Sequence, residues 1–289
     1  MLELIKLVMV SFAILIASAF LLAGLFLLMI KPNRKSSERM KAFRGLYIAH
    51  RGLHNNTTDA VENSMAAFEK AVANGYGIEM DIQVTKDGVP VVFHDFTLDR
   101  ACGVKGKVKD YTYDELIKYP LFHSKQRIPK FEDVLKLVDR KVPLIIEYKV
   151  ERTDLSVCKN TEKLLKDYKG LYCIESFNPL VVYWFRRKHG NIPRGQLSDD
   201  FYKELGEYTI IHLAVQYLLV NWLGKPDFIA YNHKYPKLIS RRLCRTLFHN
   251  TAAAWTIKNE QDLERARANF DIFIFDSFIP KKIANQPYK

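Results

Sequence analysis

The sequence predicts an α/β protein in which one N-terminal transmembrane helix precedes a (β/α)₈ TIM barrel. Two observations lead to this fold class. The first 30 residues are strongly apolar, and the rest of the 289-residue chain alternates short β-rich runs with amphipathic segments. This alternation favours a parallel sheet, and the remaining length suits the eight βα units of a barrel. A doubly wound open sheet is the alternative, but the chain lacks a G-x-G-x-x-G or P-loop motif to support nucleotide binding on it.

The N-terminal segment is long enough to cross a bilayer. Leu7–Ile30 contains no charge, and its 24 residues exceed the length needed to span a hydrocarbon core of about 30 Å. Ala17-Ser18-Ala19 resembles a signal-peptidase site, but the apolar run continues beyond it, so we expect an uncleaved anchor.

Charge around the span predicts its orientation. Only Lys6 and the amino terminus precede it, whereas a basic cluster follows it, which predicts a single-pass cell-membrane protein with its C-terminal domain in the cytoplasm. We therefore expect an anchor (1–30), a basic juxtamembrane linker (31–44) and a barrel domain (45–289). The basic cluster consists of Lys31, Arg34, Lys35, Arg39, Lys41 and Arg44.

Periodicity places the elements of the barrel domain. Amphipathic helices are expected within 63–75, 130–140, 179–190 and 259–270, the last with Asn259 as its N-cap. Asp87-Gly88 between two strand-like runs predicts a β-hairpin that returns the chain toward the strand bearing Glu79 and Asp81. Strands are expected at 46–49, 78–84, 89–93, 144–150, 171–176, 194–197, 228–231, 252–255 and 272–275.

The formal net charge of +12 fits nucleic acid, an anionic membrane or a phosphorylated substrate as partner. No nucleic-acid-binding motif is present and no long basic run lies outside the membrane flank, so we expect a membrane partner and no nucleic acid. The four cysteines form no C-x-x-C pair, which argues against a zinc site. Nothing in the sequence indicates an oligomeric state.

Three carboxylates in predicted strands indicate a cation site. Glu79 and Asp81 are two residues apart and share one face of their strand. A solvated strand face would give the same alternation, but Glu147 lies in the apolar run PLIIEYKV, where an unpaired carboxylate is costly. An ion pair with Lys149 or a metal would satisfy it. Three carboxylates without a Cys or His ligand cluster favour Mg²⁺ or Ca²⁺ over Zn²⁺.

Two histidines at strand ends supply acid–base chemistry. One of His50 and His94 can take a proton from a nucleophile while the other gives one to a leaving group. Arg51 and Lys149 provide positive charge for an anionic group. Together with the carboxylates, these residues indicate metal-assisted hydrolysis of a phosphate ester.

From Ile48 onward the chain resembles the glycerophosphodiester phosphodiesterase family. The motifs that carry the resemblance are IAHRG, VENSMAAFEKAVANGYGIEMDIQVTKDGVPVVFHD, TLDRACGVKGKVKDYTYDEL, IPKFEDVLKLV, IIEYK, SFNPLVVYWFRRKHGNIPRGQLSD and AWTIKNEQDLERA. The resemblance implies a TIM barrel with a small insertion after the second strand, and hydrolysis of glycerophosphodiesters to glycerol 3-phosphate and an alcohol. It assigns acid–base catalysis to His50 and His94, and it implies that Glu79, Asp81 and Glu147 bind a divalent cation. Arg51 and Lys149 would bind the phosphate, and Asn63 would orient the site. Trp255 would line the glycerol or leaving-group pocket, unless its ring only packs in the core.

Some positions depart from the family pattern. Val61 stands where a proline is usual, Glu175 stands where a small polar residue is usual, and the last strand lacks its glycine-rich form. None of these departures removes an acid, a base or a ligand. Of the remaining histidines, His54 and His233 are the two that could lie near the same rim.

Other functions remain open from the sequence. The anchor motivates a lysophospholipase D acting on membrane lysolipids. Sphingomyelinase-D-type lyases share the His, Glu-x-Asp, His arrangement and would give cyclic products. A catalytically silent membrane scaffold is the non-enzymatic alternative, although every acid, base and ligand position is filled.

Overall fold

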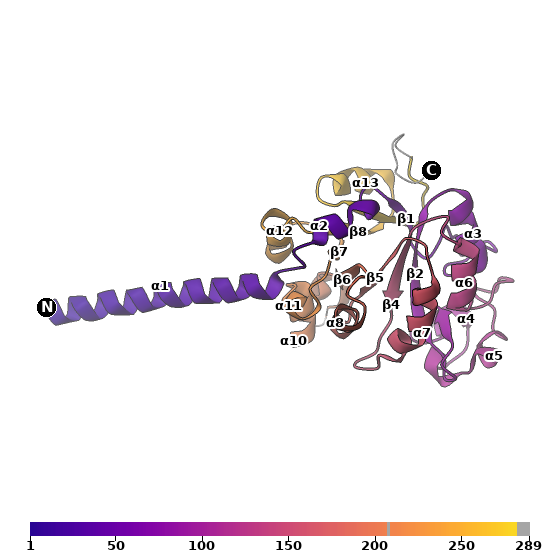
Figure 1. Cartoon of the computed structure of the whole chain (residues 1–289), viewed down its shortest axis with the longest axis horizontal. Helices are drawn as coiled ribbons and strands as arrows, with labels where there is room; N and C mark the ends of the chain where they lie inside the picture. The colour runs from indigo at the N-terminus through magenta and orange to yellow at the C-terminus, as the bar shows by residue number, and fades with distance from the viewer. Residues whose placement is uncertain (207–208, 282–289) are drawn as a thin grey trace.

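The computed structural model describes residues 1–206 and 209–281 and contains a closed parallel barrel. Its strands pair in chain order, and the first pairs with both the second and the last, so the sheet closes on itself. This closure confirms the TIM barrel and excludes the open sheet (Figure 1). The parallel strands are β1 (Tyr47–Ala49), β2 (Gly77–Val84), β4 (Leu144–Tyr148), β5 (Tyr172–Ser176), β6 (Arg194–Ser198), β7 (Phe228–Asn232), β8 (Thr251–Ile257) and β9 (Ile272–Phe275).

Helices follow the strands along the chain. The four expected helices are present, and the Asn259 side chain caps the last of them by accepting from the Asp262 backbone N–H. Helices α7 (Ser156–Asp167) and α12 (Ile239–Thr246) and the short helices between β6 and β7 were not expected. The helices are α3 (Met65–Ala73), α6 (Phe131–Val138), α7 (Ser156–Asp167), α8 (Pro179–Lys188), α9 (Phe201–Leu205), α10 (Ile210–Gln216), α11 (Asn221–Gly224), α12 (Ile239–Thr246) and α13 (Glu260–Arg267).

The insertion after the second strand is also present. Strand β3 (Pro90–Val92) pairs antiparallel with β2, which confirms the predicted hairpin. The short elements α4 (Asp99–Cys102), η2 (Val108–Asp110) and α5 (Tyr113–Leu116) follow it. They enclose a small apolar core of their own that includes Phe93, Leu98, Leu116 and Ile128.

The inside of the barrel has an apolar layer and a polar layer. Ile145 and Cys173 belong to an apolar cluster inside the barrel. Glu147 and Glu175 follow them two residues later on the same strands and therefore point to the same side. The acids are thus carried toward the carboxyl ends of the strands, where barrel enzymes place their sites.

The segment expected as a linker is packed against the barrel. It contains α2 (Ser36–Arg39) and the short η1 (Lys41–Phe43), and its Met40 and Phe43 side chains are fully buried in the interior apolar cluster. The Ser36 hydroxyl donates to the Asp227 carbonyl just before β7. The segment therefore packs against the amino end of the barrel, and the division into anchor, linker and barrel domain stays a prediction.

Helix α1 (Leu2–Ile30) extends away from the globular body (Figure 1). It is the one helix among the described residues that is long and apolar enough to cross a membrane. Its last turn contacts the body, where Ile30 is fully buried.

Candidate active site

A row of buried carboxylates crosses three neighbouring strands. The register places Asp81 of β2 opposite Glu147 of β4, and Glu147 opposite Glu175 of β5. Glu79 lies two residues before Asp81 on the same face. All four are at most 8% exposed. One oxygen from each of Glu79, Asp81 and Glu147 lies within 4.8 Å of the others, so the three expected ligands are brought together.

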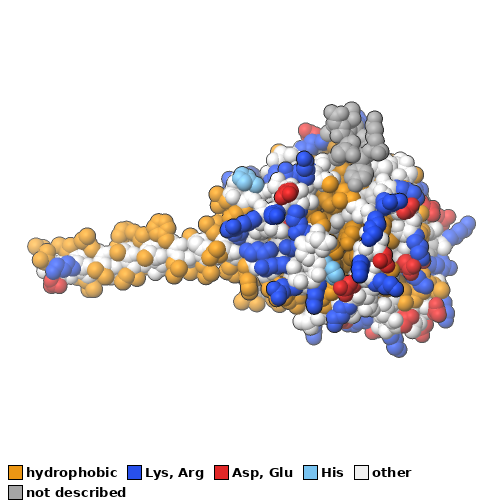
Figure 2. Space-filling view, in the orientation of Figure 1, with side chains coloured by type: hydrophobic (Ala, Val, Ile, Leu, Met, Phe, Trp, Pro, Cys, Tyr) orange, Lys and Arg blue, Asp and Glu red, His pale blue; other side chains and the backbone are white. Residues whose placement is uncertain are grey.

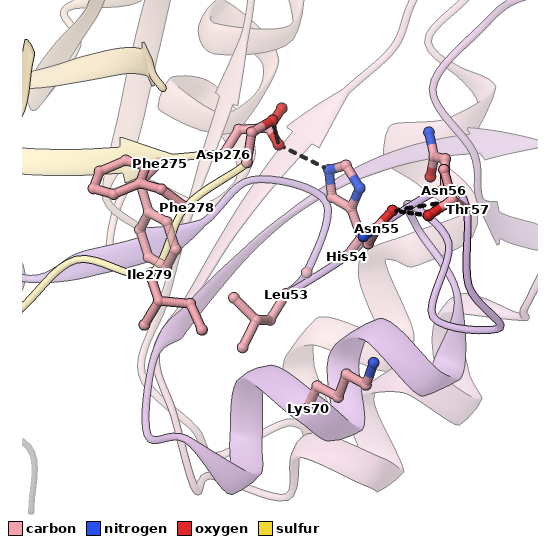
Figure 3. A pocket seen from close by; sticks show the side chains of 12 residues that line it. Leu53, His54, Asn55, Asn56, Thr57, Lys70, Phe275, Asp276, Phe278 and Ile279 are labelled. Atoms are coloured by element: carbon pink, nitrogen blue, oxygen red, sulfur yellow. Dashed lines mark hydrogen bonds and ion pairs between the residues drawn. The ribbon is translucent and has the colours of Figure 1, made fainter. Parts of the chain in front are cut away.

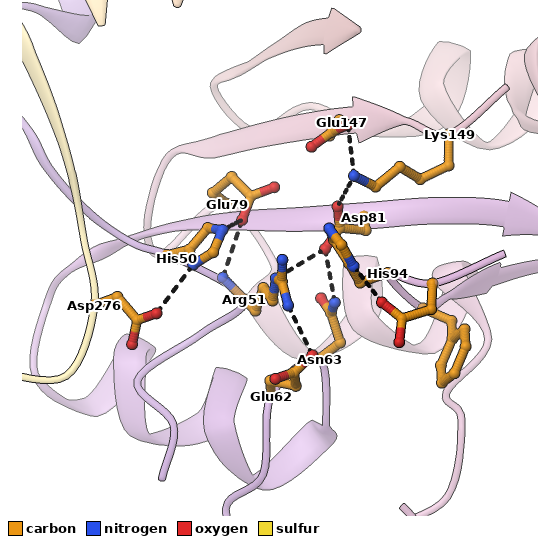
Figure 4. Close-up of polar contacts among 12 residues, drawn as sticks. His50, Arg51, Glu62, Asn63, Glu79, Asp81, His94, Glu147, Lys149 and Asp276 are labelled. Carbon is orange, nitrogen blue, oxygen red and sulfur yellow. Dashed lines mark hydrogen bonds and ion pairs between the residues drawn. The ribbon is translucent and has the colours of Figure 1, made fainter. Parts of the chain in front are cut away.

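Two cations lie beside this row (Figure 4). Lys149 Nζ is 2.7 Å from Glu147 Oε1 and 3.1 Å from Asp81 Oδ1. Arg51 Nε is 3.5 Å from Asp81 Oδ2. The expected Lys149–Glu147 pair is therefore present, but it neutralises only part of the cluster.

The charge that remains fits a divalent cation. Burial, together with the neighbouring Asp81 and Glu147, raises the pKa of Glu79 well above 4.5. Burial and Glu147 raise the pKa of Glu175 in the same way. Burial would also raise the pKa of Asp81, but Lys149 beside it lowers that pKa well below 3.8. Four carboxylates facing two cations leave two negative charges, which an oxygen-bound divalent ion would balance.

His50 follows β1 at the rim of the barrel. Its backbone N–H donates to the Phe275 carbonyl, 2.9 Å away, which ties it to the last strand. Its Nδ1 lies 3.3 Å from Asp276 Oδ2, and its Nε2 lies 4.0 Å from Glu79 Oε2. Burial lowers the pKa of His50 to about 4, although Asp276 opposes this. The ring is therefore a neutral imidazole held at Nδ1 by a carboxylate.

His94 has a similar arrangement on the other side of the site. The β2–β3 hairpin delivers it, and its Nδ1 lies 2.6 Å from Asp95 Oδ1. Arg100 Nε donates to Asp95 Oδ2 over 2.6 Å. Burial alone would raise the pKa of Asp95, but His94 and Arg100 hold this pKa far below its usual value. Each histidine thus has one ring nitrogen fixed by an aspartate.

Strained backbone positions the residues between β1 and α3. Arg51 has φ of 54°, and its backbone N–H donates to Glu79 Oε2 over 3.0 Å. Asn63 also has φ of 54°, and its side-chain amide donates to Asp81 Oδ2 over 2.8 Å. Gly52 has φ of +83°, and a Cβ there would lie 2.9 Å from Ala67. Both facts explain why glycine follows His50-Arg51.

A cavity of about 100 Å³ joins these groups. Trp255 lines it and packs edge-to-face on Phe177, with ring centroids 5.6 Å apart. The same ring packs against the interior apolar cluster, so the position of Trp255 fits both a pocket-lining role and packing in the core. Asp81 and Asn63 do not line the cavity. Asp81 pairs with Arg51 and Lys149, which do line it, and Asn63 donates to Asp81. The other seven expected residues line it: His50, Arg51, Glu79, His94, Glu147, Lys149 and Trp255.

Two residues of the site, Asp95 and Asp276, were not predicted from the sequence. Asp276 follows β9, which closes the barrel against β1, and it contacts two histidines. His54 Nε2 lies 3.3 Å from Asp276 Oδ1, in a separate pocket of about 560 Å³ (Figure 3). His54 therefore lies at the rim, as expected. His233 is there too, since its backbone N–H donates to the Trp255 carbonyl over 3.0 Å.

Glu175 was recognised in the sequence, but its direction was open. The structure turns it into the barrel beside Glu147, where one carboxylate oxygen has no hydrogen-bond partner among the described residues. A signal was present in the sequence, since Glu175 occupies a strand position equivalent to that of Glu147.

Comparison with known proteins identifies the family. The model of the glycerophosphoryl diester phosphodiesterase family matches residues 50–278. The chain belongs to this family. It is 42% identical over 112 residues to the glycerophosphodiester phosphodiesterase of Bacillus altitudinis, covering 36% of this chain and 44% of that protein. It is 39% identical over 188 residues to glycerophosphodiester phosphodiesterase 1 of Rattus norvegicus, covering 60% and 55%. Each match thus spans about half of the relative's length.

Solved structures share the fold. A phosphodiesterase of Oleispira antarctica, solved in complex with the product sn-glycerol-3-phosphate, superposes with a TM-score of 0.65 at 19% identity, covering 81% of this chain and 94% of that one. Glycerophosphodiester phosphodiesterase of Thermotoga maritima gives 0.62 at 22% identity, covering 80% and 93%. Members of the family generally use a divalent cation, and the acidic cluster of this chain suits one.

Proposed function

We propose that this protein is a cation-dependent phosphodiesterase that hydrolyses glycerophosphodiesters to glycerol 3-phosphate and an alcohol. The observation that carries the proposal is one cavity lined by two aspartate-held histidines and by acids of the carboxylate cluster. The names of the relatives support the substrate class, and the Oleispira antarctica structure supports the product.

Charged groups of the cavity would bind the phosphodiester. Arg51 and Lys149 line the cavity and can pair with the non-bridging oxygens. Glu79, Asp81 and Glu147 would hold the cation, and their oxygen ligands favour Mg²⁺ or Ca²⁺. When bound, the cation would offset the negative charge that develops on the phosphoryl oxygens.

The two histidines would move the protons. One takes a proton from the attacking oxygen, which belongs to water or, through a cyclic phosphate, to the glycerol 2-hydroxyl. The other gives a proton to the leaving alkoxide as its bond to phosphorus breaks. Asp276 and Asp95 would keep one nitrogen of each ring occupied and so direct the second nitrogen to the reaction.

Helix α1 favours a second candidate, a lysophospholipase D. A barrel held at a bilayer meets lysolipids, which contain the same glycerophosphodiester linkage. We further propose that the barrel lies on the cytoplasmic side, because the basic residues follow the span.

The test uses the full chain in lipid vesicles with glycerophosphocholine, glycerophosphoethanolamine and glycerophosphoglycerol, in Mg²⁺, Ca²⁺ or EDTA. Phosphorus NMR would identify glycerol 3-phosphate or a cyclic product. We expect release that EDTA abolishes, and loss of about 10²–10⁴-fold in kcat for His50→Asn and His94→Asn, with the exposed His249→Asn as control. Wild-type turnover in either active-site variant would refute the two-histidine mechanism.

A further inference from the structure

Exposed apolar side chains outside α1 gather on one side of the molecule. Among the described residues after α1, eight large apolar side chains are more than half exposed, and seven of these lie between Tyr202 and Leu247. Ile210 and Ile211 of α10 are 83% and 65% exposed, and Trp222 of α11 is 54% exposed. Single exposed apolar residues are ordinary, but a gathered patch marks a contact surface.

This patch lies around the root of α1, which is its last turn, ending at Ile30. Helices α11 and α12 meet the body-side end of α1 and α10 lies next to α11, whereas α4 and α5 lie at the opposite end of the molecule (Figure 1). Asn221 Nδ2 of α11 donates to the Ile30 carbonyl over 2.8 Å, and Cys244 Sγ of α12 donates to the same oxygen over 3.3 Å. Lys225 Nζ donates to the Lys31 carbonyl over 3.1 Å. The helix is therefore fixed between α11 and α12.

The length of the span leaves no stalk between the bilayer and the body. A hydrocarbon core of about 30 Å takes about 20 helical residues. A span that begins at Leu7, the first residue after the charged Lys6, therefore ends near Phe26. Phe26 and Leu27 already pack against the core of the body. The helices around the root of α1 are thus held at the level of the lipid headgroups.

The charge of this side suits anionic lipid. Between Thr209 and Leu247 the chain has six Lys or Arg residues, of which Arg241 is buried, and a single acid, Asp227, which is also buried. Figure 2 shows Lys and Arg side chains gathered on the body next to the root of α1. Arg186 Nη1 donates to the Trp222 carbonyl over 3.0 Å, which places a guanidinium beside the backbone of this exposed residue. Exposed Trp with neighbouring basic residues is typical of membrane interfaces.

We propose that the face formed by α10, α11 and α12 rests on the bilayer and delivers acyl-bearing glycerophosphodiesters from it to the active cavity. A series of neighbouring aromatic rings connects the active cavity with α10. Trp255 in the cavity packs on Phe177, Phe177 lies 6.0 Å from Phe201 between ring centroids, and Phe201 stacks on His212 at 4.9 Å. His212 belongs to α10 and directly follows Ile211.

The proposal rests on the phosphodiesterase function and narrows its substrate class. The polar cavity would take the phosphodiester, while the apolar rings between it and α10 would contact the acyl chain. The substrate class is then a lysophospholipid drawn from the membrane, in preference to a water-soluble glycerophosphodiester.

Fluorescence quenching tests the contact with the membrane. The full chain is placed in vesicles of phosphatidylcholine and phosphatidylglycerol that carry lipids brominated near the headgroup end of the acyl chain. We expect quenching of the wild type, loss of most of that quenching in Trp222→Phe, and its retention in Trp184→Phe. Equal quenching in all three proteins would overturn the proposal. So would shielding of Trp222 that follows protein concentration instead of lipid, because a second copy of the chain would then cover the face.

Activity tests the delivery of substrate. We compare kcat/KM for lysophosphatidylcholine in vesicles with kcat/KM for glycerophosphocholine in solution. Replacing Ile210 and Ile211 by Ser should lower the first roughly tenfold and leave the second unchanged. The control is Ile117→Ser next to α5, far from α1. Equal effects on both substrates, or no effect on either, would overturn the proposal. If the wild type hydrolyses neither substrate, the proposed function fails, whereas the quenching result still judges the surface.

Discussion

Asp276 shows how one side chain orients another. Its carboxylate lies 3.3 Å from His50 Nδ1, on the side of the ring away from Glu79. An amide in its place can donate to that nitrogen as well as accept from it, so the ring loses a fixed tautomer. We expect Asp276→Asn to lower kcat about 10–100-fold with little change in KM. Steady-state kinetics against the exposed Asp139→Asn would check this, and an equal rise in KM would show that Asp276 serves binding instead.

Glu175 has a buried carboxyl group, one oxygen of which has no hydrogen-bond partner among the described residues. Because burial raises its pKa, the folded state without a cation binds a proton that the unfolded state releases, so stability falls as pH rises above about 4.5. Glu175→Gln removes this loss. We expect the variant to unfold at a higher temperature than the wild type at pH 7 in EDTA, with the gap shrinking when Mg²⁺ or Ca²⁺ is added. Thermal melts in both conditions measure the difference, and a variant less stable in EDTA would contradict the excess of negative charge.

At the scale of elements, Glu62 joins the insertion to the barrel. Its Oε1 accepts from Arg51 Nη1 over 2.8 Å and from Arg100 Nη2 of α4 over 2.7 Å. Burial opposes the effect of these cations, but Arg100 and Arg51 lower the pKa of Glu62 to about 2. The corresponding stability is present above pH 4.5 and is lost as pH falls through about 2.

A substitution at Glu62 tests this joint. The depressed pKa corresponds to roughly 3 kcal/mol, but Arg100 is 46% exposed, so we expect Glu62→Gln to cost about 1–2 kcal/mol at pH 7. The cost should shrink between pH 4 and pH 2, as seen in thermal unfolding of both proteins across that range. A constant difference would mean that shape, not charge, holds the insertion. The exposed Glu132→Gln is the matched control.

Strands could be predicted more completely than helices. All nine strands and four amphipathic helices were recognised because their side chains alternate or recur with a fixed period, whereas the 12-residue α7 and the eight-residue α12 were missed. Helices α2, α9 and α11 have four or five residues, too few to show a period. Their positions depend on contacts with distant strands, as when Ser36 bonds to the residue before β7.

At the scale of the whole molecule, closure of the barrel completes the site. The acids of β2 and β4 could be grouped from the sequence because each lies in an apolar strand. Asp276 could not be joined to His50, since the two are 226 residues apart and meet only because β9 pairs with β1. The direction of Glu175 likewise depends on the register of β5 against β4. The contacts that could not be predicted from the sequence are therefore those that closure of the sheet creates.

The closed barrel also depends on residues 31–44, the segment that precedes β1. Met40 and Phe43 are fully buried at the amino end of the barrel, and burying each side chain contributes about 1.5–3 kcal/mol. Together they represent about 3–6 kcal/mol, a large part of the 5–15 kcal/mol typical of a folded domain. We expect a chain that begins at Lys31 to fold and one that begins at Gly45 to aggregate. Replacing Met40 and Phe43 by Ser in the full chain should lower the unfolding temperature markedly, whereas Ser at the exposed Leu4 and Leu15 should not. Equal melting of the two full-length variants would show that residues 31–44 are a linker after all.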